Sequence, residues 1–197
     1  MSKVMPIGDF VFIHKAYPLS IEAQAQDLAE VVAQYKNKKV SKELQEICDK
    51  RFEKLFQIYL ESKGHTYNVS YYHILIDDLV PTIKEIKDYY GRPRPKDLAE
   101  QMGIDFSGDH LGSAQTPSYP SGHTIQAYVL ALMLSDQFPE RRESLMSIAE
   151  MVSQSRIDRG VHFPTDIEHG REIAHSIHYQ IKKGFGEETQ DFKEPYS

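Results

Sequence analysis

The chain has 197 residues, which fits one domain, and a formal net charge of −6, which argues against non-specific nucleic-acid binding because such binding needs a basic surface. Hydrophobic residues make up 40% of it, enough for a core and too many for a disordered chain. Its single cysteine, Cys48, excludes an internal disulfide and a cysteine-based zinc site. The longest apolar run, 127–134, is far shorter than the ~20 residues of a transmembrane helix. We therefore expect one domain over 1–197, with no integral membrane segment and no nucleic-acid partner.

The first residues predict an irregular arm over 1–19, since Pro6, Gly8 and Pro18 interrupt regular structure. The apolar patch at 10–13 is shorter than the ~7–15 residues of a secretory signal, and no small-residue cleavage site follows it. We therefore expect a cytoplasmic protein, or a periplasmic one if a native signal has been removed.

Apolar residues at helical spacing predict that most of the remaining chain is helical. The expected helices are 20–36, 41–63, 68–90, 122–136, 139–157 and 164–183. Ser41 and Gly64 supply the start and the stop of the second helix, and Pro81 predicts a kink or a break in the third. No run alternates as a strand would, so the expected fold class is all-α, a single-domain helical bundle.

Two segments are expected to lack long regular elements. Residues 91–120 are rich in glycine and proline, which predicts a long loop with room for a short helix at 95–102. Loops of this length in compact domains are usually functional. Residues 185–197 are polar and are predicted to form a frayed tail.

Three short segments carry residues suited to anion chemistry. The pattern Lys-x6-Arg-Pro begins at Lys87, Pro-Ser-Gly-His ends at His123, and Ser-Arg-x5-His-x3-Asp ends at Asp166. Arginine presents a planar fork that matches phosphate, and lysine adds a compact charge. Taken singly, the segments have plainer interpretations: a solvated basic run, a helix cap with a surface histidine, and a structural Asp–His pair.

The residue types in the second and third segments also have a chemical interpretation. Ser121 is placed to cap the helix that follows it, and Gly122 lets a ligand approach the free N–H groups of that first turn. Asp166 falls in the first turn of the next helix and could reach back to His162. A carboxylate on one imidazole nitrogen fixes the tautomer and makes the other nitrogen a better nucleophile.

Together the three segments, which span 87–166, resemble the signature of the phosphatidic acid phosphatase type 2/haloperoxidase superfamily. The strings Tyr119-Pro-Ser-Gly-His-Thr124 and Gly160-Val161-His162 are most similar to the soluble class A bacterial non-specific acid phosphatases. The resemblance implies an all-α fold and an acid phosphatase that hydrolyses small phosphomonoesters, with phosphotransfer to alcohols as a second outcome. It also implies that the enzyme uses no metal and no other cofactor, and that vanadate inhibits it.

The resemblance further implies a role for each matching residue. Lys87, Arg94 and Arg156 would bind the phosphate oxygens, with Ser121 and the Gly122 N–H completing the binding site. The loop at 91–120 would then be an active-site loop.

Three residues would carry the reaction itself. His162 would attack phosphorus and form a phosphohistidine, and Asp166 would orient it. His123 would protonate the leaving oxygen and later activate water. Because a free histidine titrates near about 6.5, we expect an activity optimum on the acid side of neutrality.

Other interpretations stay open. A lipid-phosphate phosphatase, a vanadate-dependent haloperoxidase and a non-catalytic phosphate-binding protein would share these residues. The resemblance favours a homo-oligomer, and the residues themselves leave this undecided. His175 and His178 share a helix face but lack a third metal ligand at suitable spacing. Arg92 and Arg159 are expected to be exposed, at the rim of the positive site.

Overall fold

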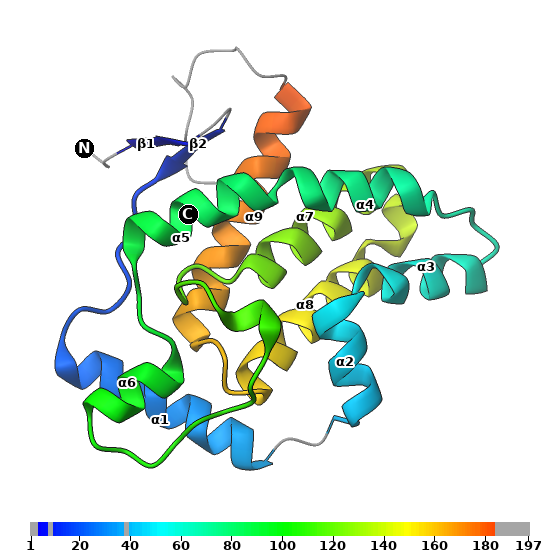
Figure 1. Cartoon of the computed structure of the whole chain (residues 1–197). Helices are drawn as coiled ribbons and strands as arrows, with labels where there is room; N and C mark the ends of the chain where they lie inside the picture. The colour runs from blue at the N-terminus through cyan, green and yellow to red at the C-terminus, as the bar shows by residue number, and fades with distance from the viewer. Residues whose placement is uncertain (1–3, 8–9, 38–39, 184–197) are drawn as a thin grey trace.

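A computed structural model of the chain describes residues 4–7, 10–37 and 40–183. The tail predicted at 185–197 lies outside the described residues. Helices dominate the described part, so the predicted all-α class is confirmed (Figure 1). No helix within these ranges combines the length and the apolar character that crossing a bilayer requires.

The helices and short 3-10 turns follow one another along the chain with short connections, except between α6 and α7. They are α1 (Ile21–Asn37), α2 (Lys42–Lys50), α3 (Glu53–Ser62), α4 (Val69–Asp78), α5 (Val80–Tyr90), α6 (Pro95–Gln101), η1 (Gly112–Ala114), α7 (Gly122–Gln137), η2 (Pro139–Arg141), α8 (Arg142–Asp158) and α9 (Pro164–Lys183).

The N-terminal segment differs from the irregular arm predicted over 1–19. Strands β1 (Val4–Ile7) and β2 (Phe10–Ile13) pair antiparallel. β2 lies along α9, where the side chain of Gln180 bonds the Val11 N–H at 2.9 Å and the Val11 carbonyl at 2.8 Å. Phe12 is buried in the core, so packing against the bundle makes this short segment extended.

The helix predicted at 41–63 is two helices. Ser41 caps α2 as expected, accepting from the Leu44 N–H at 3.2 Å. The chain leaves helical geometry at Arg51, with φ −156° and ψ 48°, and α3 starts two residues later. No glycine or proline marks this break. Phe52 is buried at the corner, and tertiary packing therefore explains it.

The helix predicted at 68–90 is broken near Pro81, which is one of the two outcomes expected there. α4 ends and α5 begins on either side of Leu79, and Pro81 occupies the first turn of α5, where its missing N–H costs no helical bond. Leu79 is buried, which fixes the angle between the two helices.

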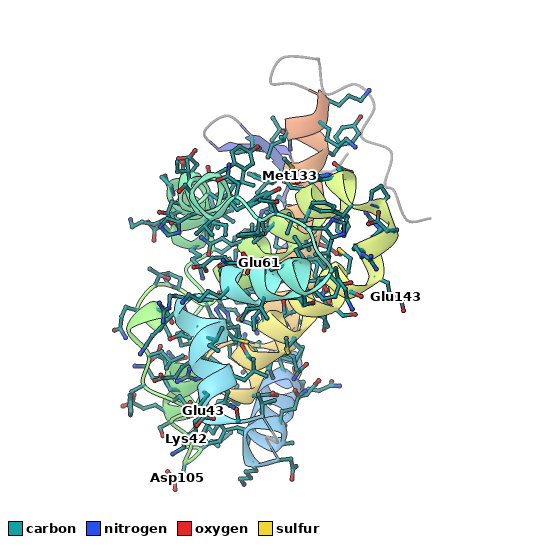
Figure 2. All side chains as sticks on the ribbon, turned by 90° about the vertical axis from the view of Figure 1, so that its right-hand side faces the viewer. Lys42, Glu43, Glu61, Asp105, Met133 and Glu143 are labelled. Atoms are coloured by element: carbon teal, nitrogen blue, oxygen red, sulfur yellow. The ribbon has the colours of Figure 1, made fainter. Side chains whose placement is uncertain are left out.

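The core is centred on α7, which packs against α8 and α9 (Figure 1). α7 is buried on nearly every side, and its buried apolar residues are Ile125, Ala127, Tyr128, Val129, Leu130, Ala131, Leu132 and Leu134. A helix that is apolar all round must lie inside the molecule. Charged residues such as Lys42, Glu61 and Glu143, which Figure 2 labels, are exposed at the surface.

A second, smaller apolar cluster joins α1 and α6 to the residues around the start of α9. Leu28 of α1, Leu98 of α6 and Phe163 are buried in it. This packing brings the carboxyl ends of α5 and α8 and the amino ends of α7 and α9 to the loop between α6 and α7 (Figure 1). All three sequence segments meet there.

Candidate active site

The amino end of α7 forms one wall of the site. The Ser121 hydroxyl oxygen accepts from the Thr124 N–H at 3.4 Å and from the Thr124 hydroxyl at 3.0 Å, which leaves its own proton to donate. At Gly122 a Cβ would lie 3.2 Å from a methyl group of Ile83 and 3.6 Å from the Lys87 side chain. Gly122 therefore allows α5 to bring Lys87 against the helix N-terminus.

α9 is held against the same helix end. The Ser121 N–H donates to the Asp166 carbonyl at 3.0 Å. At Gly170 a Cβ would lie 3.1 Å from Cβ of Thr124, so the absence of a side chain permits this close packing.

His162 and Asp166 form a buried pair with a defined tautomer. Nδ1 of His162 lies 2.9 Å from Oδ2 of Asp166, and Nε2 lies 3.0 Å from Nη1 of Arg94. A guanidinium can only donate, so Nε2 accepts and the ring proton sits on Nδ1. Burial, followed by the charges of Arg94 and Lys87, holds the pKa of His162 well below its usual value. His162 is therefore neutral, with its Nε2 lone pair facing the cations.

Asp166 is held by more than His162. Its Oδ2 also accepts from the Phe163 N–H at 2.9 Å and from the Ser118 hydroxyl. Its Oδ1 accepts from Nη1 of Arg92 at 2.7 Å. The carboxylate is thus fixed on both oxygens.

Arg92 is not the exposed residue that the sequence predicts. Its side chain is 1% exposed, and Nη2 donates to Asp27 of α1 at 2.7 Å while Nη1 donates to Asp166. The guanidinium also lies 3.9 Å from the Phe163 ring centroid. Two carboxylates from distant parts of the chain explain why this charge can be buried. Arg159 is likewise mostly buried, paired with Asp109 at 2.9 Å.

Lys87 and Arg94 point inward and donate to main-chain oxygens. Nζ of Lys87 bonds the carbonyls of Pro117 at 2.7 Å and Ser118 at 3.3 Å. Arg94 bonds the carbonyls of Thr116 at 2.8 Å and Val161 at 2.7 Å. The same lysine and arginine nitrogens could instead donate to the oxygens of a bound phosphate.

The positive charges at the site are incompletely compensated. Burial, then the charges of Arg94 and Arg156, lowers the pKa of Lys87 to about 7, against the opposing pull of Asp166. Burial likewise lowers the pKa of Arg94 to about 10. An anion placed among these groups would relieve both the desolvation and the repulsion.

Arg156, fully buried at the end of α8, is the third cation. Its Nη1 donates to Oδ1 of Asp49 at 2.5 Å and its Nη2 to the Ser113 hydroxyl at 3.0 Å. Its Nε is buried and bonds no partner among the described residues. An unpaired buried donor is costly, which makes Nε available to a ligand oxygen.

His123 lies one residue into α7 and contacts α2. Its Nε2 lies 2.8 Å from the Asp49 carbonyl, an acceptor, so Nε2 carries the proton in the neutral ring. Burial, followed by the charge of Arg156, lowers the pKa of His123 to about 3. His123 is therefore neutral at physiological pH.

The structure thus brings together all eight predicted site residues. It adds residues that the sequence segments did not include: Asp27, Asp49, Ser113 and Ser118. The first two lie on α1 and α2, remote from every motif, and no local pattern marks them. Ser118 stands two residues before Pro120, and that nearness to the Pro-Ser-Gly-His string was its only signal.

The described residues contain no group of three or more His, Cys, Asp or Glu side chains arranged to hold a metal ion. His178 instead bonds Asp136 at 2.8 Å.

The fold and the candidate site define a helical protein with buried lysine and arginine side chains gathered at the amino end of α7. A family model for the PAP2 superfamily matches residues 69–188, more than half of the chain. The chain therefore belongs to the PAP2 superfamily, and the resemblance inferred from the three segments is confirmed.

Relatives of known activity match part of the chain. It is 37% identical over 87 residues to a non-specific acid phosphatase of Salmonella typhimurium, covering 44% of this chain and 34% of that protein. It is 31% identical over 88 residues to an acid phosphatase of Zymomonas mobilis, covering 45% and 33%. The match thus spans about a third of the length of these curated relatives.

A solved structure shares the fold. The crystal structure of a transmembrane PAP2-type phosphatidylglycerolphosphate phosphatase from Bacillus subtilis matches with a TM-score of 0.56. The match covers 88% of this chain and 90% of that one, at 21% identity. At this level of identity, the similarity shows that the two proteins share a fold.

Proposed function

We propose that this protein is a metal-independent acid phosphatase that hydrolyses phosphomonoesters through a phosphohistidine on His162. The observation that carries the proposal is the unprotonated Nε2 of His162, 3.0 Å from Arg94 in a site with two further cations. A neutral imidazole with its lone pair directed at an anion site is an activated nucleophile.

The substrate phosphate binds among Lys87, Arg94 and Arg156, and at the N-terminus of α7. Its oxygens accept from the Lys87 and Arg94 donors that bond main-chain carbonyls in the structure. They also accept from Nε of Arg156, which bonds no partner within the described part of the chain. The Ser121 hydroxyl and the Gly122 N–H supply further donors. These fixed charges neutralise the transferring phosphoryl group, the work that a metal ion performs in other phosphoryl-transfer enzymes.

In the first step, Nε2 of His162 forms a bond to phosphorus while the bond to the leaving oxygen breaks. Asp166 accepts from Nδ1–H throughout and stabilises the positive charge that the ring acquires. His123 gives its proton to the leaving oxygen, so that a neutral alcohol departs.

In the second step, water attacks phosphorus and the P–N bond breaks. His123, now neutral, takes the proton of the water, and phosphate leaves with His162 restored. An alcohol that replaces water would receive the phosphoryl group, which gives the phosphotransferase activity.

Burial and the charge of Arg156 keep the pKa of His123 low. A bound dianionic phosphate offsets the charges of Arg156 and Lys87 and so raises the pKa of His123 towards the working pH. Protonation of the acid is therefore coupled to substrate binding, and activity should fall as pH rises above neutrality.

The test is hydrolysis of p-nitrophenyl phosphate at about pH 5–7 in excess EDTA. We expect turnover by the wild type and a rate of hydrolysis at least about a thousandfold lower in His162→Ala. Rapid quenching without acid should trap a phosphorylated chain in the wild type and not in the variant. His73→Ala is the matched control, because His73 is exposed on α4, where it pairs with Asp77 one turn away. Turnover that EDTA abolishes, or that survives in His162→Ala, would contradict the proposal.

A further inference from the structure

Asp49 is a carboxylate inside the candidate site that none of the sequence segments contains. It lies in the last turn of α2, and its side chain is only 7% exposed. Oδ1 accepts from Nη1 of Arg156 at 2.5 Å and from the Ser113 hydroxyl at 2.5 Å. Burial opposes ionisation of this carboxyl, but Ser113 and Arg156 more than offset it and hold the pKa of Asp49 below its usual value. Asp49 is therefore a buried anion beside a phosphate-binding cation.

The main chain of the same residue contacts the candidate general acid. The Asp49 carbonyl accepts from Nε2 of His123 at 2.8 Å, and the carboxylate Oδ1 lies 3.8 Å from that nitrogen. The last carbonyls of a helix have no intrahelical partner, and the break at Arg51 leaves this one free to face α7. The unpredicted break between α2 and α3 thus frees the Asp49 carbonyl to accept the hydrogen bond from His123.

The tautomer of His123 follows from this contact. With Nε2–H donated to a carbonyl, the lone pair of the neutral ring is on Nδ1, which becomes the nitrogen that gains and loses the proton. Without the carbonyl the two tautomers would interconvert, and only one of them could act on the leaving group.

The charges around His123 come from four elements. Arg156 of α8 and Lys87 of α5 disfavour its protonation, and the neighbouring His162 is neutral. Asp49 of α2 favours protonation through both its carbonyl and its carboxylate. Asp166, the other carboxylate at the site, is already bonded to His162 and Arg92.

We propose that Asp49 is a positioning residue for two groups at once: its carboxylate orients the guanidinium of Arg156, and its carbonyl and charge hold His123 so that Nδ1 carries the catalytic proton. This inference rests on the proposed function and adds to it the residue that makes His123 competent as an acid.

The first test compares leaving groups. p-Nitrophenolate leaves with little proton assistance, whereas the alcohol of glycerol 2-phosphate needs it. General acid catalysis contributes roughly a hundredfold to ten-thousandfold, so Asp49→Asn should lower kcat/KM for glycerol 2-phosphate by about tenfold or more and that for p-nitrophenyl phosphate by about threefold or less. The alkaline limb of the pH profile should move to lower pH, since the variant lacks the charge that favours protonated His123.

The second test separates positioning from a structural role. Asp49→Asn removes one negative charge from the site but keeps a side-chain oxygen that can accept from Arg156 and Ser113. Inhibition by inorganic phosphate should therefore be unchanged or tighter while catalysis on glycerol 2-phosphate falls. Asp49→Glu keeps the charge and should restore the alkaline limb. Asp136→Asn is the matched control, because Asp136 also pairs with a histidine but lies at the surface near the end of α7.

An NMR titration of the His123 ring in the phosphate-bound protein tests the inference without turnover. We expect a lower pKa for His123 in Asp49→Asn than in the wild type, with Asp136→Asn unchanged. Equal His123 titrations, or wild-type leaving-group selectivity in Asp49→Asn, would overturn the inference. Parallel loss of phosphate affinity and thermal stability would also overturn it, in favour of a structural role. A wild type that turns over neither ester would instead refute the proposed function, and the titration would still decide the role of Asp49.

Discussion

Nη1 of Arg92 lies 2.7 Å from Oδ1 of Asp166, and the guanidinium is fixed at its other end by Asp27, also at 2.7 Å. Asp166 in turn holds Nδ1 of His162. Buried ion pairs from Asp27 through Arg92 to Asp166, and a hydrogen bond from Asp166 to His162, therefore connect α1 to the candidate nucleophile. The orientation of His162 thus depends on a residue that does not touch it.

Arg92→Gln should be strongly destabilising, because it leaves Asp27 buried without its cationic partner. Breaking a buried ion pair from one side costs roughly 3–5 kcal/mol in the free energy of unfolding. Arg171→Gln is the control: Arg171 pairs with Glu150 but is half exposed, and exposed pairs contribute about 0–1 kcal/mol. Urea denaturation of both variants measures the difference, and similar values for the two would show that the burial of Arg92 has no energetic consequence.

Lys87→Met should change how stability depends on pH. The pKa of Lys87 is about 7 in the folded protein and 10.5 in the unfolded chain, so the unfolded chain binds the extra proton between these values. The wild type should therefore gain stability relative to the variant from about pH 7 to pH 10, by about 2 kcal/mol or more, since one pKa unit corresponds to about 1.4 kcal/mol.

Chemical denaturation across that pH range measures the free energy of unfolding of the wild type and of Lys87→Met. Lys84→Met is the control. Lys84 is exposed and pairs with Asp88 one turn away, so its variant should show no such trend. If the difference in the free energy of unfolding between wild type and Lys87→Met does not depend on pH, folding does not lower the pKa of Lys87.

His123→Asn should remove a loss of stability in acid. The pKa of His123 is about 3 when folded and 6.5 when unfolded, so the wild type should lose stability relative to the variant as pH falls from 6.5 towards 3. Sulfate, whose charge is constant in this range, should offset that loss in the wild type because a bound anion raises the pKa of His123.

Thermal unfolding with and without sulfate, at about pH 5 and about pH 8, tests the coupling of His123 to the anion. We expect sulfate to stabilise the wild type more at the lower pH, and the increase to be smaller in His123→Asn. The same sulfate effect in both proteins at both pH values would count against that coupling.

Gly108→Ala should push the loop between α6 and α7 away from the turn that precedes His162. Gly108 has φ 62°, and a Cβ there would lie 2.6 Å from the Gly160 carbonyl oxygen, an impossible contact. Overpacking of this kind costs about 1–3 kcal/mol, and activity should fall with it. Gly112→Ala is the matched control in the same loop, since nothing lies within 4 Å of its added Cβ. If both variants unfold at the wild-type temperature, Gly108 does not anchor the loop.

The helices and the ends of several of them were predictable from local signals. Ser41 and Ser121 cap α2 and α7, and Pro81 separates α4 from α5. Such signals work because a cap or a proline acts on backbone groups within one turn. The break at Arg51 and the hairpin at β1 and β2 were not predictable, since burial of Phe52 and the bonds of Val11 to Gln180 involve distant parts of the chain.

The sequence by itself determined which groups the candidate site contains. The three segments already specified three cations, two histidines, a carboxylate and a capped helix N-terminus. Only the tertiary structure decided how those groups are charged and held. Arg92 and Asp49 are ordinary polar residues in the sequence, and they became structural and positioning candidates because folding places each in a buried pair with a residue far along the chain. Burial and long-range pairing set tautomers and pKa values, and neither is encoded in local spacing.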